Sequence, residues 1–399
     1  MTSITAPLFR FVLLYSALYF SFGAASPFLP SFLETRGISA EEIAIVFASG
    51  TAIRLIAAPI VGRLADGFGA LRLLLAVCSV AAAAAALSYL PARGFQTLLL
   101  VGLCYAAALA PTTNLADALA LVASKDKSGA GFEYGWVRGA GSAAFIVGSI
   151  VAGIATSAFG LAVICWLQAG VLMTVPWAAR RVPETATAAA DAAQGGSPRV
   201  LTLAKSPTFR RVVLIAALIL GSHAMHDTFA IIRWQAAGIA PWQTGLLWSV
   251  AVAAEVAVFF LIGPRLVGYL TAPGSMALAA VCGAVRWCVS ALTADIVAIA
   301  LIQPLHGLTF ALLHLACMQV IAQTVPRQLA ATAQALYGTV GIGIATAILI
   351  LLSGWLYAHL GPSAFFCMSL LCLSALPLTI GLRHAALADV DAAQEQGQP

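Results

Sequence analysis

Charged residues are scarce in this sequence, and their scarcity excludes most classes of protein. Asp, Glu, Lys and Arg make up 9% of the 399 residues, 61% are hydrophobic, and the formal net charge is +5. The mean hydropathy is +0.98, and a soluble domain has about a quarter charged residues. The composition therefore excludes a soluble enzyme or a nucleic-acid-binding protein. It indicates a polytopic membrane protein, with room for about a dozen spans of about 20 residues.

Metal, redox and catalytic spacings are also lacking. No Cys-x-x-Cys pair occurs, and all eight cysteines lie in apolar runs, so we interpret them as small buried hydrophobes and predict no metal site and no cofactor. Neither a Gly-x-Ser-Asp nor a His-Glu-x-x-His pattern is present, and the segment 223–227 is a weak substitute. We therefore predict that the protein is not an enzyme.

The apolar runs predict membrane helices. They are rich in aliphatic residues and Ala and contain Gly and Pro, which favours helices over barrel strands. We predict an all-α integral membrane protein with twelve transmembrane helices in two six-helix bundles. The first run has the length of a full span rather than of a cleavable signal. The predicted spans are 8–33, 41–61, 70–90, 95–122, 134–157, 160–180, 209–233, 242–263, 273–293, 295–324, 329–356 and 361–382.

Residues 181–208 interrupt the rhythm of the spans. This stretch contains Gly195-Gly196-Ser197-Pro198 and several basic residues, which is typical of a flexible linker. We predict an N-terminal bundle at 1–180, the linker, a C-terminal bundle at 209–383 and a disordered polar tail at 384–399.

The basic residues predict the orientation. Fourteen Lys and Arg residues fall on the side of the termini and the linker, whereas only Arg36, Arg93 and Arg233 fall on the other. By the positive-inside rule the first side is cytoplasmic. We therefore expect a multi-pass protein of the inner (plasma) membrane with both termini and the linker in the cytoplasm.

Three arginines fall inside predicted spans: Arg54, Arg138 and Arg286. An arginine in a bilayer costs several kcal/mol unless it finds a partner or water. We expect five ionisable groups to line a transport pathway, namely Asp117, Arg138, Glu255, Arg286 and His306. The other polar or aromatic candidates in the spans are Asn114, His223, His226, Asp227, Trp248, Trp287, Gln303, Phe310 and His314.

Spacing and context qualify these candidates. Asn114 and Asp117 share a helix face, and the four side chains from Gln303 to His314 are spaced as one continuous stripe. For several of the candidates a structural role is an alternative to a role in transport. These roles are core packing for His223, His314, Trp248 and Trp287, a cytoplasmic gate for Arg54, and an ion pair with the tenth or eleventh span for Asp227.

The segment 62–72 carries a recognisable motif, Gly-Arg-Leu-Ala-Asp-Gly-Phe-Gly-Ala-Leu-Arg. It resembles the Gly-x-Leu-Ala-Asp-x-x-Gly-x-(Arg/Lys) signature of the major facilitator superfamily, which implies the major facilitator fold. We expect Gly62 and Gly69 to allow a tight loop and close helix approach, Asp66 to cap or pair at a helix end, and Arg72 to supply cytoplasmic charge. A degenerate copy of this motif begins at residue 263. Aligning the two copies places Arg54 and Glu255 at equivalent positions of two internal repeats.

A narrower resemblance is to the lactose permease branch of that superfamily. Phe132-Glu133-Tyr134-Gly135 followed by Arg138 is similar to its fifth span, and four further charged positions agree: Asp117, Glu255, Arg286 and His306. The resemblance implies that Asp117 and Arg138 hold substrate, that Glu255 joins them to a proton network, and that Arg286 and His306 tune proton transfer. Thr309 stands where that branch has its proton-carrying glutamate, so the carrier must differ.

Several blocks resemble the phenylpropionate permease family of the same superfamily. They are Thr113–Leu119, Tyr134–Arg138, Gly141–Phe145, Trp234–Gly238, Leu247–Ser249, Ala254–Val256, Val285–Trp287, Leu305–Phe310 and His314–Ala316. The resemblance covers both halves. It implies a proton-coupled importer of small organic solutes, typified by aromatic acids, working by alternating access.

We assign two candidate sets on this basis. For substrate binding they are Asn114, Asp117, Arg138, Trp248, Glu255, Gln303 and Phe310, with Trp248, Phe310 and Trp287 as an aromatic wall. For proton coupling they are Glu255 as first choice of carrier, Arg286, His306 and Asp227. The expected partners are a small-molecule substrate, protons and the bilayer, with the protein as a monomer. Alternatives are a sugar or nucleoside symporter, a proton-driven exporter of lipophilic compounds, and a transport-dead sensor.

Overall fold

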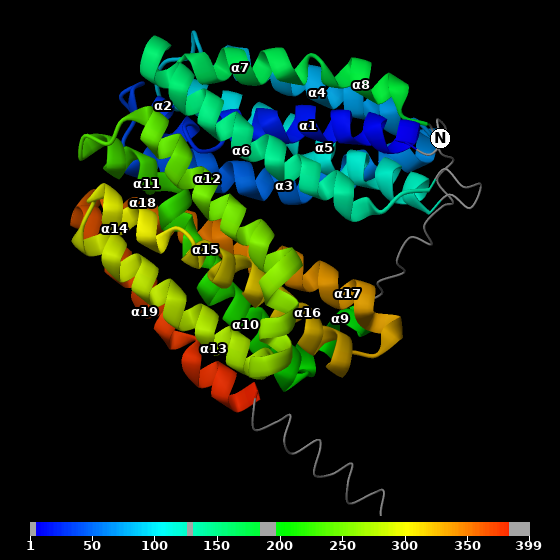
Figure 1. Ribbon diagram of the computed structural model, residues 1–399, viewed down its shortest axis with the longest axis vertical. Coiled ribbons are helices and arrows are strands. Elements are labelled where there is room, and N and C mark those ends of the chain that lie inside the picture. The colour runs from blue at the N-terminus through cyan, green and yellow to red at the C-terminus, as the bar shows by residue number, and fades with distance from the viewer. Residues whose placement is uncertain (1–4, 126–130, 184–196, 383–399) are drawn as a thin grey trace, which may run out of the picture. The chain divides into compact units, whose positions relative to one another are not determined.

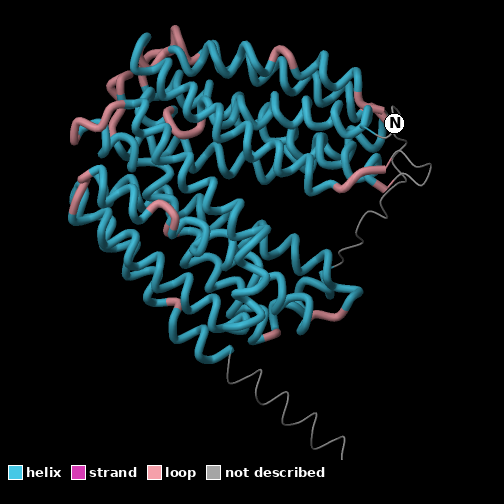
Figure 2. Tube along the Cα trace, in the orientation of Figure 1, coloured by secondary structure: helices cyan, strands magenta, loops and turns pink. Residues whose placement is uncertain are grey.

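The computed structural model describes residues 5–125, 131–183 and 197–382, and its regular elements in these ranges are all helical (Figures 1 and 2). The predicted all-α class is confirmed. The stretches 184–196 and 383–399, which include much of the predicted linker and the predicted tail, lie outside the described residues. Within the rest of the linker stretch, Ser197–Lys205 forms helix α9.

The first half of the chain contains six apolar segments, and the first is divided. Helix α1 ends at Ala25 and a short helix, α2, begins at Leu29, so the predicted single span 8–33 is wrong in detail. Ser39 then caps α3, with reciprocal bonds between Ser39 and Glu42. The helices are α1 (Thr5–Ala25), α2 (Leu29–Glu34), α3 (Ala40–Phe68), α4 (Leu71–Ser88), α5 (Phe95–Ser124), α6 (Tyr134–Phe159), α7 (Val163–Leu172) and α8 (Val175–Arg181).

The second half contains several helices that pass through π-helical segments. After α9 come α10 (Pro207–Gly221), α11 (His223–Ala236), α12 (Pro241–Ala257), α13 (Gly263–Leu292), α14 (Ile296–Ile302), α15 (Leu305–Gly307), α16 (Leu313–Thr324), α17 (Ala330–Leu336), α18 (Ala345–Leu360) and α19 (Phe365–Ser374). The π-helical segments are Val258–Ile262, Leu308–Leu312 and Tyr337–Ile344.

The described helices account for twelve membrane crossings. Ten helical segments are long and apolar enough to span, and two of them, Pro241–Leu292 and Ala330–Leu382, have 52 and 53 residues. A straight helix of that length would measure about 78 Å, against a hydrocarbon core of about 30 Å. Non-helical backbone at Thr271 and positive φ at Gly361 interrupt the two segments. Each therefore supplies two crossings, as predicted.

Packing divides the chain into two compact units, each built from separate stretches of sequence. The first unit comprises Met1–Ala190, Asp227–Ala253 and Ile350–His359, and the second comprises Asp191–His226, Ala254–Leu349 and Leu360–Pro399. The boundaries predicted for two consecutive bundles stay a prediction.

Glycines bring the backbones of α1 and α6 together inside the first unit. A Cβ on Gly23 would lie 2.1 Å from the carbonyl oxygen of Phe145, and one on Gly148 would lie 2.4 Å from that of Phe20. The Ser149 hydroxyl also donates to the Gly23 carbonyl at 3.1 Å. Small residues permit this approach in lipid, where packing rather than hydrophobicity drives helix association. The contact holds the tyrosines of α1 beside the first turns of α6.

A similar approach orders the second unit. A Cβ on Gly307 would lie 2.5 Å from the carbonyl oxygen of Ala254, so α15 meets the end of α12 without side chains between them. This approach brings together His306, which precedes Gly307, and Glu255, which follows Ala254.

The 62–72 motif is largely helical rather than a loop. Helix α3 continues to Phe68, and Gly69 ends it in the left-handed conformation (φ 60°, ψ 30°), which glycine adopts without steric cost. A Cβ on Gly62 would meet nothing within 4 Å, and the close helix approach expected there stays a prediction. The Arg72 guanidinium donates to the Val182 carbonyl at 3.2 Å, beside the end of α8.

The cysteine interpretation also needs correction. Five of the eight thiols are buried as predicted, but Cys104 is exposed on α5, and Cys288 and Cys367 are half-buried. Sequence hydropathy cannot separate core-facing from outward-facing positions on an apolar helix, because both environments are apolar.

Candidate functional site

The first polar cluster surrounds the carboxylate of Asp117 on α5. Tyr15 of α1 and Tyr134 of α6 both donate hydroxyl hydrogen bonds to Asp117 Oδ1, the latter at 2.7 Å. The same oxygen lies 3.6 Å from Arg138 Nη1. Side chains of α1 and α6 therefore converge on one carboxylate oxygen of α5, and all of these contacts lie within the first unit.

Arg138 occupies the second turn of α6 and is only partly buried. Its Nη1 donates to the Tyr19 hydroxyl, and its guanidinium carbon lies 5.3 Å from the centroid of the Tyr19 ring. The side chain is 42% exposed, and within the described ranges its hydrogen bond and ion pair both use Nη1. A guanidinium has five N–H donors in a fork. Arg138 can therefore receive a second, bidentate partner while it keeps Asp117.

One of the two partners expected for Arg138 lies beside it within the first unit, and the other lies in the second unit, so the predicted pairing with Glu255 stays a prediction. Asp117 makes the ion pair, whereas Glu255 contacts His306 in the second unit. Asn114 is exposed on α5, one turn before Asp117.

Sequence analysis missed Tyr15 and Tyr19 and gave Tyr134 no role. The available signal was the spacing of four residues between the two tyrosines of the first span, which places them on one helix face. Their rings stack in the structure, with centroids 5.9 Å apart. A tyrosine pair in an apolar span also fits simple packing, so the spacing alone did not mark a site.

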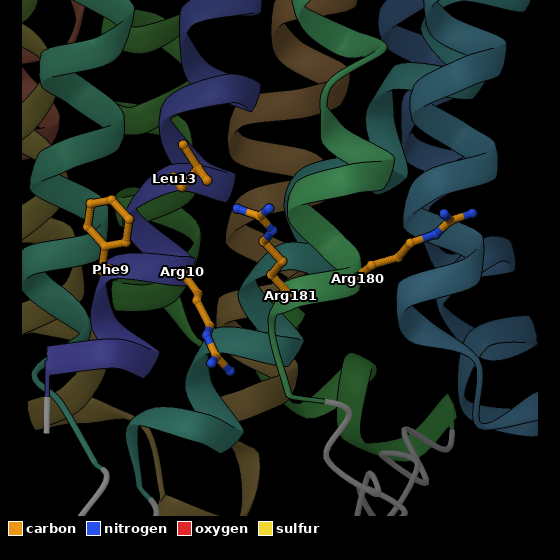
Figure 3. Close-up of a pocket in the computed structure, with 5 residues that line it drawn as sticks. All are labelled: Phe9, Arg10, Leu13, Arg180 and Arg181. Carbon is orange, nitrogen blue, oxygen red and sulfur yellow. The ribbon is translucent and has the colours of Figure 1, made fainter. Parts of the chain in front are cut away.

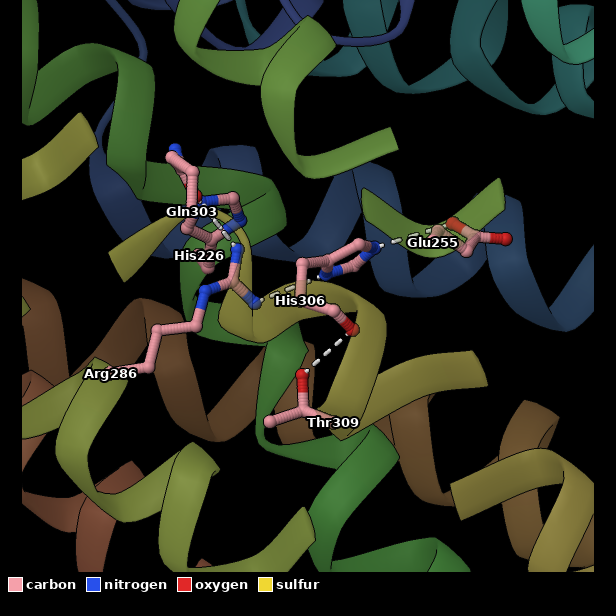
Figure 4. Close-up of polar contacts among 6 residues, drawn as sticks. All are labelled: His226, Glu255, Arg286, Gln303, His306 and Thr309. Atoms are coloured by element: carbon pink, nitrogen blue, oxygen red, sulfur yellow. Dashed lines mark hydrogen bonds and ion pairs between the residues drawn. The ribbon is translucent and has the colours of Figure 1, made fainter. Parts of the chain in front are cut away.

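The second cluster surrounds Arg286 of α13, which has no exposed surface. Figure 4 shows its guanidinium directed at His306, Gln303 and His226. Nη1 lies 3.1 Å from His306 Nδ1, and Nη2 lies 3.1 Å from Gln303 Oε1 and 3.4 Å from His226 Nε2. The guanidinium carbon is also 4.5 Å from the centroid of the Trp287 ring. The predicted grouping of Arg286, His306 and Gln303 is therefore present in the structure.

The hydrogen-bond pattern assigns the tautomer of His306. A guanidinium only donates, so His306 Nδ1 must accept and the ring proton lies on Nε2. That nitrogen is 3.4 Å from Glu255 Oε2. Neutral His306 thus connects a buried cation to a carboxylate that is partly open to its surroundings. A proton placed on Glu255 would remove the negative charge of the carboxylate and so weaken its hydrogen bond with His306 Nε2.

The predicted stripe on the tenth span is interrupted. Phe310 stacks on His306 with centroids 5.6 Å apart, which continues the stripe from Gln303. His314 lies instead against Phe259 and Tyr337, whose hydroxyl is 3.3 Å from His314 Nδ1. The π-helical segment Leu308–Leu312 lies between His306 and His314, and a π-turn changes the angular position of every later residue.

Two further predictions concern positions beside His306. Thr309 is buried, and its hydroxyl donates to the His306 carbonyl at 3.2 Å rather than joining the Arg286–His306–Glu255 chain (Figure 4). Trp287 is fully buried, and its indole donates to the Ser222 hydroxyl at 2.8 Å. A role for Trp287 in an aromatic wall for substrate is therefore wrong.

Three further candidates lie in the first unit. Asp227 is exposed on α11, and Trp248 is half-buried on α12. Arg54 is exposed on α3 and interacts electrostatically with Tyr89 and Tyr105. The functions predicted for these three stay predictions.

These features define the class of protein. Twelve apolar crossings with ionisable clusters inside the helices are typical of secondary transporters, in which such groups form substrate and ion pathways. Solved structures with the same fold include the nucleoside transporter NupG, with a TM-score of 0.79 at 16% identity over 94% of this chain and 98% of that one. A bacterial homolog of the human lysosomal transporter Spinster gives a TM-score of 0.70 at 15% identity over 98% of both chains.

The chain belongs to the MFS_1 like family, whose model matches residues 8–368. It is 30% identical over 364 residues to a probable 3-phenylpropionic acid transporter of Escherichia coli (strain K12), covering 91% of this chain and 94% of that protein. It is 26% identical over 347 residues to the maltose permease of Geobacillus stearothermophilus, covering 87% and 86%. The protein is therefore a multi-pass transporter of small molecules of the major facilitator type, and not an enzyme.

Proposed function

We propose that this protein is a proton-coupled symporter that imports a small organic acid, with an aromatic acid as the favoured class. The observation that carries the proposal is the environment of Arg138. It is an intramembrane guanidinium, 42% exposed, held to its carboxylate at 3.6 Å by one nitrogen. A substrate carboxylate would complete the fork through two parallel N–H···O bonds.

The neighbours of Arg138 suit a ring attached to that carboxylate. The half-buried rings of Tyr19 and Phe22, with centroids 5.4 Å apart, give an aromatic surface beside the guanidinium, and the fully buried ring of Tyr15 stacks on Tyr19 from behind at 5.9 Å. Aromatic pairs prefer offset-stacked or edge contacts, which a substrate ring would extend. The relative in Escherichia coli carries the printed name of a 3-phenylpropionic acid transporter.

The proton is proposed to bind at Glu255, with Asp227 and His306 as the reserve positions and no other cofactor. Deprotonated Glu255 accepts from His306 Nε2, which in turn leaves Nδ1 to accept from Arg286. Protonated Glu255 would hold His306 in that orientation more weakly, because the acceptor would have lost its charge. Because these groups lie on α12, α13 and α15, one proton would alter the contact among three helices.

The proposal also covers the membrane and the orientation of the protein in it. The distribution of basic residues supports an inner-membrane protein with cytoplasmic termini. It would act as a monomer by alternating access of the bundles 1–180 and 209–383.

Proton movement in lightly buffered, de-energised cells tests the proposal. Cells containing the protein receive 3-phenylpropionate, cinnamate, a nucleoside or a disaccharide, and the external pH is recorded. Alkalinisation with the two aromatic acids, absent in cells with the Arg138→Lys variant, is expected. The proposal is wrong if both acids enter the cells without a change in external pH. It is also wrong if none of the added solutes changes the external pH although the protein is in the membrane.

A sugar is the second candidate substrate, and one observation favours it. The hydroxyls of Tyr15 and Tyr134 donate to Asp117, and that of Tyr19 accepts from Arg138, so the cluster offers more hydrogen-bonding groups than the sequence suggested. Alkalinisation with the disaccharide alone would select this candidate.

A further inference from the structure

A basic pocket of about 480 Å³ lies in the first unit where α1 begins and α8 ends. Figure 3 shows its lining: three residues of α1 and two of α8, namely Phe9, Arg10, Leu13, Arg180 and Arg181. Three of the five are arginines and none is acidic. None belongs to the two clusters described above, so the pocket is separate from the proposed transport chemistry.

Positive charge is concentrated here beyond the lining itself. Arg72 bonds to the carbonyl of Val182, the residue that directly follows Arg181. Arg10, Arg180 and Arg181 are all exposed. Clustered cations of one sign raise the local concentration of anions. A ligand with a compact negative charge would relieve their mutual repulsion.

Arg181 is held ready for such a ligand. Its guanidinium carbon lies 3.4 Å from the centroid of the Trp177 ring, a cation–π contact that fixes the plane of the fork. In Figure 3, Arg10 and Arg181 project from facing helices beside Phe9 and Leu13, whereas Arg180 extends away from α1. The fixed fork of Arg181 on α8 and the exposed side chain of Arg10 on α1 thus flank the pocket from two helices, and because their guanidinium groups point in opposite directions in Figure 3, contact with one phosphate group requires Arg10 to change rotamer.

We propose that this pocket binds the phosphate headgroup of an anionic phospholipid. Arg10 and Arg181 contact the phosphate oxygens, and Arg180 adds to the local potential. The neighbouring apolar surface favours a lipid over a free anion, since Phe9 is 67% and Trp177 50% exposed. Aromatic side chains of this kind are enriched at membrane interfaces, and basic pockets between helices on the cytoplasmic side suit lipid headgroups. The bound lipid joins the start of α1 to the end of α8.

Thermal unfolding of the full chain in nanodiscs tests the site. Discs of phosphatidylcholine alone are compared with discs that also contain phosphatidylglycerol, and inorganic phosphate is added separately to the neutral discs. We expect phosphatidylglycerol to raise the unfolding temperature and to be retained in native mass spectrometry. Arg10→Gln combined with Arg181→Gln should weaken retention roughly 25-fold, at about fivefold for each arginine. Arg210→Gln, an exposed arginine that does not line the pocket, is the matched control and should retain lipid like the wild type.

Three outcomes would overturn the proposal. They are equal stabilisation by both disc compositions, equal retention by the double variant and the wild type, and stabilisation by inorganic phosphate without any by phosphatidylglycerol. Stabilisation by inorganic phosphate alone would show that the pocket binds a soluble anion and not a lipid headgroup. Stability in neutral discs is measured first. If the double variant unfolds there, Arg10→Gln alone replaces it, because that change leaves the stack of Arg181 on Trp177 intact.

Discussion

Gly307 lies so close to Ala254 that a Cβ on the glycine would come within 2.5 Å of the alanine carbonyl oxygen. The residues that adjoin them, His306 and Glu255, are 3.4 Å apart. The proposed proton site thus depends on a backbone contact between α15 and the end of α12, and not only on the identity of its side chains.

The first prediction concerns this contact. Gly307→Ala must move α15 away from α12, because a carbonyl oxygen cannot yield to a methyl group at that distance. The His306–Glu255 contact should lengthen, and accumulation of substrate against a gradient should fall at least about tenfold, which corresponds to about 1.4 kcal/mol. Uptake in energised cells measures this. Gly268→Ala, on α13 where a Cβ meets nothing within 4 Å, is the control and should accumulate substrate normally.

The second prediction concerns the fork of Arg138. Arg138→Lys keeps the charge but supplies a point donor in place of a planar fork, so substrate binding should be lost although the protein folds. Binding is measured as the ligand-induced shift of the unfolding temperature of purified protein. Arg210→Lys, an exposed arginine outside both clusters, is the control. Transport at the wild-type rate by Arg138→Lys would remove Arg138 from the site.

The third prediction separates proton coupling from substrate binding. Glu255→Gln keeps a hydrogen-bond acceptor for His306 Nε2 but cannot take up a proton. Exchange of labelled for unlabelled substrate should continue, whereas uphill accumulation should stop and uptake should lose its dependence on external pH. Both rates are measured in the same vesicles. Accumulation that survives the change would move the carrier to Asp227 or His306.

The fourth prediction concerns stability. Gln303→Leu removes the oxygen that accepts from Arg286 Nη2, and a buried donor left without that acceptor costs about 1–3 kcal/mol. The unfolding temperature in detergent should therefore drop. The control, Gln323→Leu, changes an exposed glutamine of α16 and should unfold near the wild-type temperature. Equal unfolding temperatures for the two variants would show that Arg286 finds another acceptor.

The sequence by itself determined the fold class and which charges needed an explanation. Twelve apolar stretches of the right length can only be membrane helices, and Arg138 and Arg286 inside them require polar partners. The pairing of Asp117 with Arg138 was one of two alternatives at that stage. The resemblance of residues 62–72 to a family signature gave the superfamily without any coordinates.

Only the tertiary structure decided which partners meet. Tyr15 is 102 residues from Asp117 in sequence, and their contact exists because α1 packs against α5 as well as α6. The burial of Trp287, the turn of His314 away from His306 and the place of His306 between Arg286 and Glu255 are likewise set by packing. An apolar helix has no periodic pattern strong enough to fix which face meets which neighbour, since lipid and core are both apolar. The contacts therefore follow from the approach of backbones, which a single sequence does not encode locally.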